Sequence, residues 1–239
     1  MKILITGATS GIGRQLAVDY HKLGNEVWAI GRDDGRLSEL ASLGLHVAKV
    51  DLSDREASLA WFAGLASLDL AILNAGTCEY IDLPAFDSRL VSRVLRANVE
   101  TMAVSVEGVL PLLRRGVRPH LVGIGSSAAY LPLPRAEAYG ASKAAVAYLI
   151  DTLRVDLRRE GIDVSLVSPG FVKTPLTDRN DFPMPLRVSV EEASAAIRQG
   201  IARRRSEIHF PRRFTLPLKL LSWLPRPLWG RLAQTMVKP

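Results

Sequence analysis

The sequence predicts an α/β fold: a doubly wound parallel sheet of about seven strands, flanked by helices. Three observations indicate it. Short apolar segments alternate with helical stretches along most of the chain. A glycine-rich turn joins the first apolar segment to the first helical one. The length of 239 residues and the hydrophobic content of 48% suit one domain with a sizeable core.

The expected strands recur at regular intervals along the chain. They lie near residues 2–6, 26–30, 46–50, 69–73, 119–125, 163–167 and 207–210. Helical stretches fall between them, notably at 90–113 and 136–157. Parallel strands must be joined by crossovers, which are usually helical, so this alternation favours a parallel sheet. We expect one domain over residues 1–211 and a C-terminal extension over residues 212–239.

The first strand runs directly into the glycine-rich turn, where Gly7, Gly11 and Gly13 precede an amphipathic helix. Glycines let the backbone approach a pyrophosphate, and the free N–H groups and dipole at a helix start attract its charge. Strand, turn and helix together predict a dinucleotide site. The helix residues expected to face inward are Leu16, Ala17, Tyr20 and Leu23.

Tyr139 and Lys143 are four residues apart on an expected helix, so both side chains lie on one face. A phenol ionises near pKa ~10, and a neighbouring ammonium group favours the phenolate. Ser126 follows the apolar strand, where its hydroxyl points into the ligand crevice of a doubly wound sheet. Taken singly, Tyr139 also reads as a surface tyrosine and Ser126 as a turn cap. Their joint spacing favours an acid/base device.

The segment Thr-Gly-Ala-Thr-Ser-Gly-Ile-Gly at residues 6–13 is similar to the cofactor fingerprint of the short-chain dehydrogenase/reductase family, in its compact one-domain subdivision with a Rossmann-like fold. The resemblance extends from residue 2 to about residue 210. Leu73 departs from it, because the family commonly has a second Asn there, and we expect Leu73 to add core packing instead of a hydrogen bond. Further landmarks follow in family order: Asp51-Leu52, Asn74-Ala75-Gly76 and Pro169-Gly170.

The resemblance implies an oxidoreductase that transfers hydride between a nicotinamide and a carbonyl or alcohol. It implies that Tyr139 is the general acid in reduction and the base in the reverse direction. Lys143 would lower the pKa of Tyr139 and hold the nicotinamide ribose, and Ser126 would hydrogen-bond the carbonyl oxygen. Asn98 would hold a water that links the lysine to solvent; a capping or helix-interrupting Asn is the alternative. The residues expected to contact the cofactor are Gly7, Thr9, Ser10, Gly11, Ile12, Gly13, Arg32, Asp51, Leu52, Asn74, Ala75, Gly76, Tyr139, Lys143, Pro169, Gly170, Val172 and Thr174.

The end of the second strand favours NADP(H) over NAD(H). An NAD enzyme usually places an acidic residue there to bind the ribose 2′-hydroxyl. This chain has Gly31, followed by Arg32 and, one helical turn later, Arg36. A 2′-phosphate would therefore meet positive charge. The alternative is an Arg32 that only solvates a loop and is neutralised by Asp33 and Asp34.

Substrate contacts are expected in two loops. Residues 130–134 offer an apolar wall, and residues 177–188 resemble a lid. We therefore expect a hydrophobic ketone, aldehyde or acyl-type carbonyl, or the matching alcohol, as the small-molecule substrate. A catalytically silent dinucleotide-binding sensor or scaffold is the alternative. The presence of all four catalytic residue types favours the enzyme.

The single cysteine, Cys78, cannot form an intrachain disulfide, and four scattered histidines offer no metal-ligand cluster, so no metal is expected. Cys78 is expected to be a small buried filler, with a position near the cofactor as the alternative. The apolar run before Gly7 is too brief for a signal peptide, which predicts a cytoplasmic location. The resemblance implies a homodimer or homotetramer that pairs through 90–113 and 136–157. A solvated or partner-facing edge is expected at Arg89, Arg93 and Arg96.

The net charge of +7 resides at the C-terminal end, where residues 203–239 carry nine Lys and Arg against the single acid Glu207. Lys219, Arg226 and the prolines break any membrane-spanning run. One interpretation is an extension that folds over the substrate cleft or a subunit interface. The other is a peripheral, membrane-associated segment in which arginines meet anionic headgroups. Nucleic-acid binding is not expected, because the basic residues interleave with aliphatic side chains. The second interpretation places Trp223, Leu224 and Trp229 in the lipid.

Overall fold

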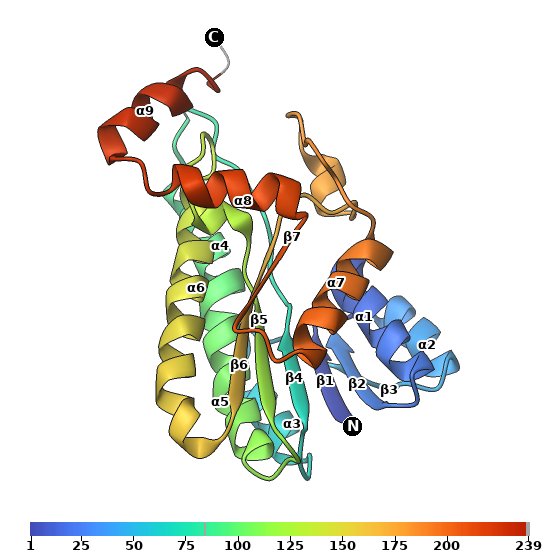
Figure 1. Cartoon of the computed structure of the whole chain (residues 1–239). Helices are drawn as coiled ribbons and strands as arrows, with labels where there is room; N and C mark the ends of the chain where they lie inside the picture. The colour runs from blue at the N-terminus through green and yellow to red at the C-terminus, as the bar shows by residue number, and fades with distance from the viewer. Residues whose placement is uncertain (84, 238–239) are drawn as a thin grey trace.

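The computed structural model describes residues 1–83 and 85–237. Its parallel sheet has the strand order β3-β2-β1-β4-β5-β6-β7, which confirms the doubly wound α/β fold (Figure 1). Lys238 and Pro239, at the end of the expected extension, lie outside the described residues. The strands are β1 (Lys2–Thr6), β2 (Glu26–Gly31), β3 (His46–Lys49), β4 (Leu70–Leu73), β5 (His120–Ile124), β6 (Asp163–Pro169) and β7 (Glu207–Phe210).

β1 lies inside the sheet and pairs with β2 on one side and β4 on the other. Ile5 is level with Ala29 across one ladder and with Ile72 across the other. The strand order reverses between β1 and β4, so a crevice opens at their carboxyl ends. Both motifs of interest follow strands that end there: the glycine-rich turn follows β1, and Ser126 follows β5.

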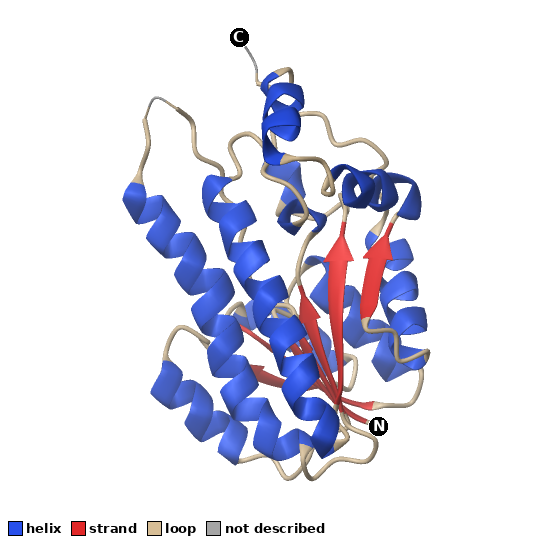
Figure 2. Cartoon of the chain, turned by 60° about the vertical axis from the view of Figure 1, so that its left-hand side comes forward, coloured by secondary structure: helices blue, strands red, loops and turns tan. Residues whose placement is uncertain are grey.

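Helices cover both faces of the sheet (Figures 1 and 2). One face carries α1 (Gly11–Lys22), α2 (Asp34–Ser42) and α7 (Val190–Ala202). The other carries α3 (Arg55–Ala63), α5 (Thr101–Leu113) and α6 (Glu137–Leu157), with α4 (Ser88–Leu95) beside α6. Successive side chains of a strand point to opposite faces, and each face therefore has its own core.

β1 shows how the alternation divides the core. Ile3 and Ile5 pack on the α1 side with Leu16, whereas Leu4 packs on the opposite side with Phe62. Leu16, Ala17 and Tyr20 are buried as expected. The expectation for Leu23 was wrong: α1 ends at Lys22, and the Leu23 side chain is 63% exposed. Leu73 is buried in the second core, in agreement with its expected packing role.

Several helices begin with a side-chain cap, but α1 does not. Asp33, Asp54 and Ser189 each accept a hydrogen bond from a first-turn N–H of their helix, which satisfies one of its otherwise unpaired donors. Ser10, which precedes α1, makes no such bond, and the first turn of α1 has no acidic residue. The amino end of α1 is therefore left with donors and positive dipole available to an anion.

Two helices follow β7, α8 (Arg212–Leu221) and α9 (Arg226–Gln234), and they lie beyond the carboxyl ends of β6 and β7 (Figure 1). α8 is held by an ion pair between Lys219 and Glu207 of β7. α9 is held by Trp229, whose Nε1 donates to the Pro132 carbonyl at 2.8 Å. Trp229 is only 4% exposed, so the expectation that it enters lipid was wrong. Across 1–83 and 85–237, no helix has both the length and the hydropathy that a bilayer span requires.

Candidate active site

The glycine-rich turn adopts backbone conformations that only glycine accommodates easily. Gly7 and Gly11 have φ of 62° and 52°, in the left-handed region. A Cβ atom on Gly7 would lie 2.9 Å from the Ala75 Cα, and one on Gly13 would lie 2.4 Å from the Gly7 carbonyl oxygen. The turn therefore packs closely against both the loop after β4 and the start of α1.

A cleft of about 660 Å³ lies at the carboxyl ends of β1, β2 and β4. Another hollow, of about 510 Å³, adjoins Met1 and Asp69 at the amino ends of the strands. Ligands of doubly wound sheets bind at the carboxyl ends, so the first cleft is the candidate cofactor site. The predicted cofactor residues that line it are Gly7, Thr9, Ser10, Gly11, Ile12, Arg32, Asp51, Leu52, Asn74, Ala75, Gly76 and Thr174.

The other predicted cofactor residues do not line this cleft: Gly13, Tyr139, Lys143, Pro169, Gly170 and Val172. The Val172 side chain is buried, and its carbonyl accepts the Thr177 hydroxyl at 2.5 Å. Gly170 donates its N–H to the Phe210 carbonyl at 2.7 Å. The Val172 carbonyl and the Gly170 N–H are thus used in hydrogen bonds within the protein. Thr174 and Leu176 of the loop after β6 do line the cleft, and the Thr174 methyl group lies beside Gly11.

The end of β2 is crowded by a threonine. A Cβ atom on Gly31 would lie 2.5 Å from the Thr9 Cγ2 atom, so an acidic side chain does not fit there without movement of Thr9. Arg32 lies on the cleft wall near Asp51. Two hydrogen bonds from Ser53, with Arg32 adding to them, hold the pKa of Asp51 below its usual value.

Neither acid that follows Arg32 pairs with it. Asp33 binds the Arg36 guanidinium at 3.5 Å, and Asp34 binds Lys49 at 2.5 Å. The alternative in which these two carboxylates neutralise Arg32 is therefore not what the structure shows. Arg36, which was expected to add charge for a 2′-phosphate, is instead engaged by Asp33.

Tyr139 and Lys143 share one face of α6, and the Lys143 Nζ lies 5.9 Å from the centroid of the Tyr139 ring. Lys143 donates to the Ile124 carbonyl at 3.0 Å, at the end of β5. Ser126, two residues later, is within hydrogen-bonding reach of the Tyr139 phenol. The Ser126 Oγ also accepts from the Ala128 N–H at 3.1 Å, which fixes the hydroxyl at the strand end.

The pKa of the Tyr139 phenol is raised above its usual value, mainly by burial, with the Cys78 side chain adding to the rise and Ser126 opposing it. The lowering that was expected from Lys143 is therefore not found: burial is the largest influence on this pKa, and the group that lowers it is Ser126. Burial also lowers the pKa of Lys143, to about 8. Near neutral pH the pair is thus a neutral phenol beside an ammonium group.

Asn98 sits in a π-helical turn (Arg96–Glu100) between α4 and α5, a feature often found at functional sites. Its Nδ2 donates to the Thr77 carbonyl at 3.0 Å and to the Ser142 hydroxyl at 2.8 Å. Its Oδ1 accepts from the Thr77 N–H at 2.6 Å. Asn98 therefore fixes the loop after β4 to α6. Both Nδ2 hydrogens are thus used in hydrogen bonds to protein groups. The expected water would have to bind to another group of Asn98, such as its main chain.

Sequence reasoning missed Ser142 and Arg93. Ser142 links Asn98 to the Tyr139 carbonyl, to which its hydroxyl donates at 2.7 Å. Ser142 lies between Tyr139 and Lys143 in the segment Tyr-Gly-Ala-Ser-Lys, so its place in the motif could have identified it as a site residue. Arg93 was expected only as an edge residue, yet it lines the cleft and pairs with Glu79 at 3.0 Å.

A chain of aromatic side chains leads away from Tyr139. Tyr80 lies 6.3 Å from Tyr139 and 5.0 Å from Phe182 of the expected lid, measured between ring centroids. Phe171 then bridges Phe182 and Phe214 of α8, at 6.2 and 5.2 Å. Four separate segments thus form one cluster, which we call the aromatic cluster (Tyr80, Phe171, Phe182 and Phe214).

Cys78 lies beside this cluster rather than in the core. It is partly buried, burial raises the pKa of its thiol, and its neighbours include Tyr80 and Lys143. Cys78 is thus not the fully buried filler that was expected, and it lies near Lys143 of the catalytic pair.

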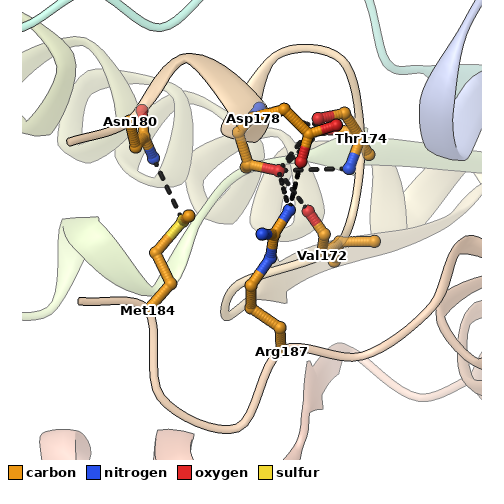
Figure 3. Close-up of polar contacts among 7 residues, drawn as sticks. Val172, Thr174, Asp178, Asn180, Met184 and Arg187 are labelled. Atoms are coloured by element: carbon orange, nitrogen blue, oxygen red, sulfur yellow. Dashed lines mark hydrogen bonds and ion pairs between the residues drawn. The ribbon is translucent and has the colours of Figure 1, made fainter. Parts of the chain in front are cut away.

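Ion pairs hold the lid over the aromatic cluster. Arg135 contacts Asp82 of the loop after β4 and Asp181 of the lid, each at 2.6 Å. Within the lid, Arg187 pairs with Asp178 at 2.5 Å (Figure 3). Arg135 therefore ties the lid to the loop that carries Tyr80.

The comparisons with known proteins agree with this geometry. The family model described as short chain dehydrogenase matches residues 1–182. An uncharacterized oxidoreductase of Myxococcus xanthus is 34% identical over 243 residues, which cover 98% of this chain and 96% of that protein. A Sphingobium yanoikuyae short-chain dehydrogenase in complex with NADPH superposes with a TM-score of 0.80 at 26% identity, covering 94% of this chain and 96% of that one. The Pseudomonas aeruginosa RhlG/NADP active-site complex has the same TM-score and identity, with coverages of 90% and 96%. The chain belongs to the short-chain dehydrogenase/reductase family.

Proposed function

We propose that this short-chain dehydrogenase/reductase is an NADP(H)-dependent oxidoreductase that interconverts a hydrophobic carbonyl compound and the matching alcohol, with Tyr139 as its acid/base. One observation carries the proposal. The Tyr139 phenol is held between Ser126 and Lys143 at the end of β5 and adjoins the aromatic cluster.

Features of the cleft support a dinucleotide that carries a 2′-phosphate. The amino end of α1 offers donors without a side-chain cap or an acid, which suits a pyrophosphate. Thr9 fills the space of an acidic side chain at Gly31, and Arg32 brings positive charge to the same wall. Two structural relatives are described as complexes with NADPH and NADP. When bound, the nicotinamide supplies the hydride in reduction and accepts it in oxidation.

The residues at the end of β5 would handle the proton. In reduction, Ser126 donates a hydrogen bond to the substrate carbonyl oxygen and orients it. Tyr139 gives its phenolic proton to that oxygen as the hydride reaches the carbon. The phenolate that remains is stabilised by the Lys143 ammonium group, which keeps its proton near neutral pH because its pKa is about 8. In oxidation the same proton moves from the alcohol to Tyr139.

The aromatic cluster supports a hydrophobic substrate. Its rings contact one another, and Tyr80 approaches Tyr139, so a carbonyl that reaches the phenol would lie beside apolar surface. Phe182 comes from the lid, whose Asp181 pairs with Arg135. Substrate selection would thus depend on the lid and on the C-terminal extension together.

The test is a panel of aliphatic and aromatic ketones, aldehydes and alcohols, assayed with NADPH, NADH and their oxidised forms. We expect turnover of hydrophobic members with the phosphorylated cofactor. Tyr139→Phe should lower kcat by roughly 10²-fold or more, because it removes the transferable proton. Tyr20→Phe is the matched control, since it removes a phenol hydroxyl from α1 at a position that does not line the cleft.

Three results would contradict the proposal. Turnover restricted to small, highly polar compounds would exclude the hydrophobic substrate. Tighter binding of NADH than of NADPH would exclude the cofactor preference. Tight NADPH binding without turnover of any compound would favour a dinucleotide-binding sensor.

We also infer that the chain forms a homodimer or homotetramer that pairs through α4, α5 and α6. The exposed Tyr148 and Val155 side chains on α6 support this inference, because large apolar groups on a helix face favour burial by a partner. Light scattering of the eluted protein gives the mass directly, and a monomer at micromolar concentration would contradict the inference.

A further inference from the structure

The two helices of the extension expose an unusual amount of apolar surface. Trp223, in the link between them, is 83% exposed. Leu216 and Leu220 are one turn apart on α8, and Leu228 and Leu232 are one turn apart on α9, so each pair forms a stripe along its helix. We call Leu216, Leu220, Trp223, Leu224, Leu228 and Leu232 the tail face; all six side chains are exposed.

Other side chains of these helices anchor them to the domain. Thr215 of α8 is fully buried and bonded to His209 at 2.8 Å, and Lys219 pairs with Glu207. Trp229 of α9 is buried and bonded to Pro132. Because these contacts fix the rotation of both helices, the tail face cannot turn inward without breaking them. The exposure of its apolar side chains is therefore a consequence of how the two helices are anchored, and not of loose packing at the end of the chain.

The charge around the tail face has one sign. Arg212 and Arg213 on α8 and Arg226 and Arg231 on α9 are exposed. From residue 208 to residue 237 the chain has no Asp or Glu. A symmetric contact between two copies of this face would bring like charges together, which disfavours a second copy of the chain as its occupant. An apolar stripe edged by arginines instead matches a surface that is negatively charged outside and apolar beneath.

We propose that the tail face binds the surface of a bilayer containing anionic lipids, with α8 and α9 lying in the interface. The leucines and Trp223 would enter the boundary between headgroups and acyl chains, and the arginines would meet lipid phosphates. Helices of 10 and 9 residues are too short to cross a bilayer, so the contact is peripheral. The proposal does not depend on the reaction proposed above.

The test is co-sedimentation of the full chain with vesicles of phosphatidylcholine plus phosphatidylglycerol, compared with phosphatidylcholine alone. We expect binding to the mixed vesicles and much weaker binding to the neutral ones. The charge variant Arg226→Glu/Arg231→Glu should weaken partitioning by roughly tenfold or more. Its control is Arg158→Glu/Arg159→Glu, because these exposed arginines lie beyond the far end of α6 (Figure 1).

The apolar contribution is tested separately. Leu220→Ser/Trp223→Ser should reduce binding to mixed vesicles by a similar factor. Val117→Ser removes an equally exposed apolar side chain from the loop before β5 and should change nothing. Circular dichroism of each variant checks that the fold is intact. On binding, the fluorescence of Trp223 should shift to the blue, and Trp223→Phe should remove that shift.

Two outcomes would overturn the proposal. One is equal partitioning of the wild type with mixed and neutral vesicles, or of the wild type and both tail variants with mixed vesicles. The other is a mass that depends on concentration in the absence of lipid and falls to that of a smaller assembly in Leu220→Ser/Trp223→Ser. That result would assign the tail face to contact between copies of the chain.

Discussion

The Thr9 methyl group occupies the space that a side chain on Gly31 would need: the Thr9 Cγ2 atom and a Cβ atom on Gly31 would be 2.5 Å apart. Contacts of that length do not occur without displacement of one partner. The glycine turn after β1 and the end of β2 are thus matched to each other. The match leaves the wall near Arg32 without a carboxylate at position 31.

This contact predicts how cofactor preference can be changed. Gly31→Asp alone should lower thermal stability, because it overpacks against Thr9 at a cost of about 1–3 kcal/mol. Thr9→Ala/Gly31→Asp should recover that stability and favour NADH over NADPH by about tenfold relative to wild type, since a carboxylate repels the 2′-phosphate. Thr9→Ala is the control and should keep the original preference. Fluorescence titration with both cofactors measures the ratio, and an unchanged ratio in the double variant would refute the idea.

Lys143 predicts a pH dependence of stability. Its pKa is lowered to about 8 in the folded protein, from 10.5. Between about pH 8 and pH 10 the unfolded chain therefore binds more protons than the folded one, so the contribution of Lys143 to the free energy of unfolding rises with pH, by up to about 1.4 kcal/mol per unit. Urea unfolding across this range should show a shallower rise in Lys143→Met. Lys22→Met, which removes an exposed lysine, should keep the wild-type slope; identical slopes in all three proteins would exclude the prediction.

The fold was predictable because its signals are local. Alternating apolar segments marked the strands to within two residues, since a buried parallel strand needs a continuous apolar run. The ends of helices were harder to predict. Leu23 continues the apolar period of α1 in the sequence, but it lies beyond the last turn of the helix. Periodicity shows which face of a helix is apolar, and it does not show where the hydrogen-bonding pattern stops.

The candidate site was predictable where its residues share a motif and not where they meet across the fold. Four-residue spacing placed Tyr139 beside Lys143. The direction of the Tyr139 pKa was not visible, because burial depends on packing among segments far apart in the chain. Trp229 shows the same limit. The composition of the extension suited a lipid surface, yet the Trp229 ring donates a hydrogen bond to Pro132, 97 residues earlier in the chain.

Arg135 predicts a lid that opens when its ion pairs are lost. Arg135→Gln breaks the contacts with both Asp82 and Asp181. Such partly exposed pairs contribute little singly, so we expect the substrate KM to rise roughly three- to tenfold with the NADPH affinity unchanged. Limited proteolysis should cut faster within residues 173–188.

Arg118→Gln is the matched control for this prediction. Arg118 has φ of 51° and Arg135 has φ of 64°, so both substitutions keep a non-glycine side chain in the left-handed region. Arg118 lies in the loop before β5, away from the lid. Wild-type proteolysis and KM in Arg135→Gln would mean that the ion pairs do not hold the lid.

Trp229 predicts that the extension shapes the substrate side of the site. Trp229→Ala removes a buried ring and its bond to Pro132, which should free α9 and loosen the loop at 130–134. A buried Trp→Ala change costs about 3–5 kcal/mol in a closed core, and α9 can release locally, so the loss should appear first as faster amide hydrogen exchange in α9. The substrate KM should rise while NADPH binding stays constant, because the cofactor cleft has no lining residue from α9.

Trp223→Ala, at the exposed tryptophan six residues earlier, should leave both measurements unchanged in lipid-free buffer. Unaltered exchange and KM in Trp229→Ala would show that α9 does not support this loop.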